Sequence, residues 1–115
     1  MTGSVSLRGP DGVVCERCRV ADRALPRMRG LLGRRGLENG EGLLLKPSPS
    51  IMTFFMRFPI DAVFLDREQR VVKVAAGLPP WRTAAAGRAR AVLELAAGEA
   101  ERVGLAPGAR LEQSA

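Results

Sequence analysis

Clusters of glycine and proline divide this chain into short segments, and their spacing limits its fold more than any other feature. Turn-forming clusters stand at residues 9–12, 47–49, 77–80 and 107–108. Proline cannot continue the interior of a helix or of a central strand, and both residue types favour tight turns. The segments between the clusters are therefore short, and the chain must fold from small elements rather than from long helices.

Most of these segments have the composition of β-strands, because they are apolar and rich in β-branched or aromatic residues. They predict strands over residues 4–7, 13–20, 43–46, 50–56, 60–65, 70–76, 89–96 and 110–113. The four polar residues 66–69 fit a hairpin loop built around a type I turn. We therefore expect segments 60–65 and 70–76 to pair antiparallel.

Two further segments predict short helices. Pro26 suits the first position of a helix over 26–32, and Gly104 ends a second helix over 98–103. The expected class is α+β, mainly β: a curled antiparallel sheet or a small, partly open β-barrel of six to seven short strands with two short helices. The 115 residues fit a single domain, 1–115, whose core needs no disulfide or metal.

The formal net charge of +6 is concentrated in two basic blocks, residues 1–35 and 67–90. Such blocks can bind nucleic acid, but the chain has no His or Tyr and only 4% aromatic residues, so it offers little for base stacking. The apolar stretches are too short to cross a membrane, and residues 1–4 do not begin a signal peptide. We therefore expect a cytoplasmic protein without a membrane partner.

Cys15 and Cys18 form a Cys-x-x-Cys pair, a pattern that first suggests metal or redox chemistry in an intracellular protein. On a regular strand, a spacing of three residues directs the two side chains to opposite faces. A redox pair lies instead at a helix N-terminus, and zinc would need about two more ligands in a chain without His. We therefore expect ordinary strand residues, no metal site and no cofactor.

Two acidic residues stand in strand segments whose other side chains are apolar. Asp61 lies within residues 60–65, and Glu94 lies between Leu93 and Leu95. A buried carboxylate must find hydrogen bonds or a cation, or it takes up a proton. Two interpretations remain open: the acids tie loops to the sheet by accepting backbone N–H bonds, or they line a pocket with perturbed acidity.

The pocket interpretation brings in residues from other segments. Arg57, the Thr53 hydroxyl and Arg29 are the candidate partners of Asp61. Trp81 stands on a stiff loop after two prolines, where it could plug the open end of a barrel or help to grip a ligand. The candidate ligand-binding cluster comprises Arg29, Thr53, Met56, Arg57, Asp61, Trp81 and Glu94.

Several spaced motifs occur in an order that is typical of one family. They are Arg-Gly-Leu-Leu-Gly-Arg at 29–34, Gly-Leu-Leu-Leu at 42–45, Thr-Phe-Phe-Met-Arg-Phe-Pro-Ile-Asp at 53–61, Phe-Leu-Asp at 64–66, Pro-Trp at 80–81, Val-Leu-Glu-Leu at 92–95, Gly98, Gly-Leu at 104–105 and Gly108. Over residues 13–113 the chain resembles the bacterial and archaeal family called domain of unknown function 192. The resemblance implies a small, mainly β domain with no established activity.

The chain departs from this family at two positions that bear on mechanism. Many similar sequences place a Cys where Ser48 stands and a His where Met52 stands. A Cys-His pair would suggest nucleophilic catalysis, and this chain lacks it. Either those residues are not needed for the shared role, or this member has lost an activity that others keep.

Three classes of function remain. We favour a binding or accessory module with a polar pocket around Asp61, for a small anionic ligand or a protein or peptide partner, because the chain offers no complete catalytic set. A hydrolase-like enzyme would have to use Asp61 or Glu94 as its acid or base. A nucleic-acid-binding protein would use the two Arg-rich blocks, with an affinity that falls steeply with salt.

Overall fold

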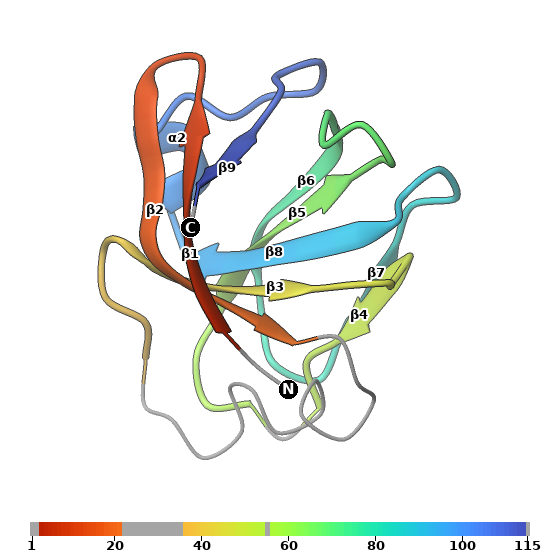
Figure 1. Cartoon of the computed structure of the whole chain (residues 1–115). Coiled ribbons are helices and arrows are strands. Elements are labelled where there is room, and N and C mark those ends of the chain that lie inside the picture. Colours follow the sequence, from red (N-terminus) through yellow and green to blue (C-terminus); the bar gives the residue numbers. More distant parts are fainter. Residues whose placement is uncertain (1–2, 22–35, 55, 115) are drawn as a thin grey trace.

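The computed structural model describes residues 3–21, 36–54 and 56–114, which form short strands and one short helix (Figure 1). The elements are β1 (Gly3–Gly9), β2 (Gly12–Ala21), β3 (Glu41–Leu45), β4 (Ser50–Met52), β5 (Ile60–Leu65), β6 (Val71–Leu78), β7 (Thr83–Ala85), β8 (Ala91–Ala96), α2 (Glu99–Arg102) and β9 (Glu112–Ser114). Among these residues, no helix has the length and apolar character needed to cross a membrane. The expected mainly β class is confirmed.

Seven strands form one sheet in the order β6-β5-β8-β3-β2-β1-β9, and β4 pairs with β7 in a separate two-stranded sheet. Neighbouring strands run antiparallel except for β2 and β3, which pair in parallel from Arg17 opposite Glu41 to Ala21 opposite Leu45. A parallel pair needs a connection of a dozen or more residues, and residues 22–40 supply one. This one parallel pair lies within a sheet that is otherwise antiparallel, as expected.

The large sheet curls until its two edge strands approach each other (Figure 1). A bridge between Arg70 and Arg110 joins the residue before β6 to the segment that leads into β9. Beside this bridge, the Val71 N–H donates to the Ala109 carbonyl at 2.7 Å. The expected curled, partly open barrel is thus confirmed as a half-barrel that closes at one end.

The two central strands, β5 and β8, are apolar on both faces, as their sequences indicated. All six residues of β5 are buried. One face of the sheet packs against α2 through the cluster that contains Leu93 and Ala100, and the other face packs against β4 through the cluster that contains Ile51 and Phe64. Full burial of one such large apolar side chain contributes about 1.5–3 kcal/mol, so both clusters stabilise the sheet.

Most predicted elements shift by one or two residues at their ends, and three features differ more clearly from expectation. The strand predicted over 50–56 ends at Met52, because the chain turns where the Met56 N–H donates to the Thr53 carbonyl at 3.2 Å. Residues 83–85, which we did not predict as a strand, pair with β4. The predicted helix over 98–103 is the shorter α2, since Gly98 has a left-handed φ of 92° before it. The helix predicted over 26–32 lies outside the described residues.

Candidate functional site

Asp61 is buried, and its carboxylate is used to anchor backbone. Only 1% of the residue is exposed. Oδ1 accepts the N–H of Gly77 at 2.9 Å, and Oδ2 accepts the N–H groups of Gly98 at 3.0 Å and Ala100 at 2.9 Å. Three backbone hydrogen bonds can satisfy the acceptor oxygens of a buried carboxylate. Of the two open interpretations, this geometry favours the one in which Asp61 ties loops to the sheet.

Glu94 lies on the opposite face of the sheet from Asp61. In the β5–β8 register Asp61 pairs with Leu95 and Ala62 pairs with Glu94, so alternation directs the two acidic side chains to different faces. Glu94 is 4% exposed, and this burial raises the pKa of its carboxyl group to about 8. The group is therefore mostly a neutral acid at pH 7. The structure does not bring Asp61 and Glu94 into one pocket.

Thr53 is fully buried and clamps the loop that carries Trp81. Its hydroxyl donates to the Pro79 carbonyl at 2.7 Å and accepts the Arg82 N–H at 2.9 Å. Its backbone N–H donates to the Arg82 carbonyl at 2.8 Å, and its carbonyl accepts the Trp81 N–H at 3.0 Å. These four hydrogen bonds fix residues 79–82 against the end of β4, and we call them the Thr53 clamp.

Trp81 presents its ring at the surface of this loop. Its φ of 66° lies in the left-handed region, which costs a non-glycine residue about 1–3 kcal/mol and persists only where the surroundings hold it. The ring stacks on Phe54, with centroids 5.5 Å apart and planes inclined by 27°. Trp81 is 53% exposed, Phe54 40% and Met52 56%. We call these three residues the aromatic platform; because half of Trp81 faces solvent, its ring is not sealed inside the barrel end.

The other members of the predicted cluster lie in different surroundings. Met56 is buried in the same apolar cluster as Ile51 and Phe64, whereas Arg57 is exposed. Arg29 lies outside the described residues. The structure thus joins Thr53 to Trp81, whereas the hydrogen-bond partners of Asp61 are the N–H groups of Gly77, Gly98 and Ala100.

A β-bulge brings Cys15 and Cys18 to the same face of β2. Val5 pairs with Cys18 and Leu7 with Cys15, so three steps along β2 match two steps along β1. Both thiols are free and fully buried in one apolar cluster. A hydrogen bond between the two side chains lowers the pKa of Cys15 and raises that of Cys18. The expectation of opposite faces was therefore wrong, because it assumed a regular strand.

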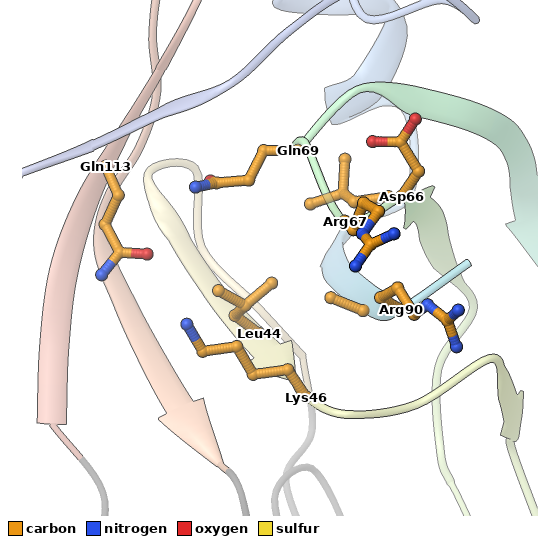
Figure 2. A pocket seen from close by; sticks show the side chains of 9 residues that line it. Leu44, Lys46, Asp66, Arg67, Gln69, Arg90 and Gln113 are labelled. Atoms are coloured by element: carbon orange, nitrogen blue, oxygen red, sulfur yellow. The ribbon is translucent and has the colours of Figure 1, made fainter. Parts of the chain in front are cut away.

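A cleft of about 160 Å³ lies at the end of the half-barrel where β3, β5 and β8 meet the turn before β6 (Figure 2). It is lined by Leu44, Lys46, Leu65, Asp66, Arg67, Gln69, Arg90, Ala91 and Gln113. We call it the mouth cleft. Sequence reasoning missed it because its residues are spread over separate segments; the only signal was that Arg67 and Arg90 mark the two ends of the second basic block.

These features define a small, curled β domain without a recognisable catalytic set among the described residues. The chain belongs to the family of uncharacterised ACR proteins called domain of unknown function 192, whose model matches residues 7–113. No curated protein matches it.

Two solved structures share the fold. A protein of unknown function from Novosphingobium aromaticivorans is 29% identical, with a TM-score of 0.83 over 96% of this chain and 84% of that one. A putative transcription regulator from Sinorhizobium meliloti is 23% identical, with a TM-score of 0.81 over 98% of this chain and 94% of that one. At that identity, the second similarity describes the fold alone.

Proposed function

We propose that this domain is a binding module that docks an acidic peptide segment of a partner protein on the aromatic platform. The observation that carries the proposal is the exposed stack of Trp81 on Phe54, held by the Thr53 clamp. A large ring that is fixed before binding loses little conformational freedom in a complex, which is why Trp is enriched among the residues that dominate interfaces. The module uses Thr53 and Trp81 of the predicted cluster.

The positive charge around the aromatic platform favours an acidic partner. The Arg82 Nη1 donates to the Trp81 carbonyl at 3.3 Å, so a guanidinium lies beside the platform, and the chain carries a formal net charge of +6. Arg57, also exposed, follows Phe54 by three residues. A segment with an apolar anchor for the rings and carboxylates for the guanidinium groups matches this surface best.

The enzyme alternative has less support from the geometry. Its candidate acid or base groups, Asp61 and Glu94, are 1% and 4% exposed and lie on opposite faces of the sheet. Asp61 already accepts three backbone N–H bonds. A general acid or base must reach the proton that it transfers, so neither group has the access that catalysis needs.

Selection from a displayed random-peptide library tests the proposal. The wild-type domain should enrich peptides that combine acidic residues with an aromatic or aliphatic anchor, and Trp81→Ala should lose at least tenfold in affinity for them, as expected for a central aromatic anchor. Val13→Ala is the matched control, because Val13 is an exposed apolar residue outside the platform at 42% exposure. Equal binding by Trp81→Ala and wild type, or enrichment of basic peptides, would overturn the proposal.

A further inference from the structure

We propose that the mouth cleft is a binding site for a small oxyanion with at least two negative charges. The cleft brings together three cationic side chains, Lys46, Arg67 and Arg90, against a single carboxylate, that of Asp66. Its lining therefore carries a net charge of +2. The cleft shares no residue with the aromatic platform, so this site is independent of the proposed peptide docking.

Three polar side chains of the lining face a common space. In Figure 2, Lys46, Gln69 and Gln113 extend from three different parts of the chain toward the space over Leu44. Arg67 and Arg90 stand on the other side of this space (Figure 2). Ammonium, guanidinium and side-chain amide groups can all donate hydrogen bonds to oxyanion oxygens.

Asp66 is already engaged elsewhere. Its Oδ1 accepts the N–H of Glu68 at 2.8 Å and the N–H of Arg70 at 3.0 Å, inside the β5–β6 turn. These backbone hydrogen bonds, that from Arg70 first, keep the pKa of the carboxyl group below its usual range. Across the described ranges, no ion pair joins Lys46, Arg67 or Arg90 to a carboxylate. The three cations therefore remain available to a ligand.

The rim of the cleft is built on fixed backbone. The Arg90 N–H donates to the Leu65 carbonyl at 2.7 Å, and the Arg90 carbonyl accepts the Ser48 N–H at 2.9 Å. The Gln69 carbonyl accepts the Leu111 N–H at 2.9 Å. These bonds connect the β5–β6 turn, the start of β8 and the segment before β9. They fix the backbone from which the side chains of Gln69 and Arg90 extend into the lining of the cleft.

The size of the cleft limits the ligand to a compact molecule. Its volume is about 160 Å³, and a cavity of about 150 Å³ holds a molecule the size of benzene. A phosphate-bearing or polycarboxylate molecule of this size matches both the charge and the volume. The shared chemistry is an oxyanion, and the probes below distinguish phosphate from carboxylate.

Heteronuclear NMR titration with pyrophosphate, citrate and acetate tests this site at low ionic strength, where charge pairing is least screened. We expect pyrophosphate or citrate to shift the backbone amides of Arg67, Gln69, Arg90 and Gln113 in a saturable manner, with acetate far weaker. The stronger of the two probes identifies the oxyanion type. Absence of saturable shifts at these amides with both multivalent probes would overturn the proposal.

Variants separate a built site from a general effect of positive charge. Arg67→Ala and Arg90→Ala should each weaken the binding on the order of tenfold, since each removes charge-assisted hydrogen bonds. Gln113→Glu, which keeps the size of the side chain and adds a negative charge, should also lose binding. Arg17→Ala is the matched control, because Arg17 is an exposed cation of β2 outside the lining. Equal weakening by Arg17→Ala would mean nonspecific attraction and would contradict the site.

Discussion

Replacing Asp61 by asparagine tests whether the buried carboxylate holds the fold together. Asparagine keeps the volume of the side chain but presents one acceptor oxygen and one N–H₂ donor. The side-chain amide can be placed in two orientations, and the better one keeps two of the three bonds. In that orientation the amide oxygen accepts the N–H groups of Gly98 and Ala100, and the N–H₂ group faces the N–H of Gly77. One backbone donor then loses its acceptor, and two bonds lose the negative charge that strengthened them.

The expected loss follows from these three changes. An unsatisfied, partly buried donor costs about 1–3 kcal/mol, and the loss of charge assistance weakens each remaining bond by about 1 kcal/mol. We therefore expect Asp61→Asn to lower the free energy of unfolding by about 3–5 kcal/mol, a large part of the roughly 5–15 kcal/mol typical of a domain. In urea, with a slope of roughly 2 kcal/mol per molar, the midpoint falls by about 2 M.

Equilibrium urea unfolding followed by far-UV circular dichroism measures this difference at pH 7. Glu16→Gln is the control, because it makes the same type of change on an exposed side chain of β2 and should stay within about 0.5 kcal/mol of wild type. If Asp61→Asn also stays within that range, the carboxylate does not hold its three backbone partners, and the anchoring interpretation is refuted.

Three further predictions follow from buried or crowded groups. Burial raises the pKa of Glu94 from 4.5 to about 8, so the folded state holds the proton more tightly than the unfolded state. As the pH rises between those values, the free energy of unfolding should fall by up to about 1.4 kcal/mol per pH unit. Urea midpoints at pH 5, 6.5 and 8 should show this fall in the wild type and a flatter dependence in Glu94→Gln. Gly42→Ala places a Cβ 2.9 Å from the Cys15 sulfur and should cost about 1–3 kcal/mol in thermal unfolding, whereas Gly87→Ala, which meets nothing within 4 Å, should be near neutral. Equal melting temperatures for the two glycine variants would contradict that crowding. Thr53→Val removes the hydroxyl bonds of the Thr53 clamp and should make Trp81 more mobile. The fluorescence anisotropy of Trp81 should then fall, and an unchanged anisotropy would refute this role of the hydroxyl.

The fold was largely predictable because its strongest signals are local. The strand over residues 60–65 has the bounds of β5, and the turn after it contains Asp66, whose side chain accepts the N–H groups two and four residues later. A short apolar run followed by a polar turn needs no information from the rest of the chain.

Features that depend on distant segments escaped prediction. The parallel pairing of β2 with β3 and the bulge in β2 both depend on the partner strand, so neither is encoded in a local pattern. The hydroxyl of Thr53, just after the end of β4, bonds residues 26 and 29 positions away, which no local pattern indicates.

For the candidate site, the sequence predicted that the two acidic side chains are buried, but it did not predict their hydrogen-bond partners. Apolar neighbours indicated that Asp61 and Glu94 would be shielded, and both are. The partners of Asp61 lie 16, 37 and 39 positions along the chain, and its separation from Glu94 follows from the β5–β8 register. Only the folded backbone could show that these acids belong to different faces of the sheet.

The fluorescence of Trp81 tests the proposed docking most directly, because the chain contains one Trp and no Tyr. A selected acidic peptide should shift the emission to shorter wavelength and reduce quenching by acrylamide, since docking covers a ring that is 53% exposed. Binding of such a peptide with unchanged emission and unchanged quenching would contradict the account, because the partner would then occupy a surface other than the aromatic platform.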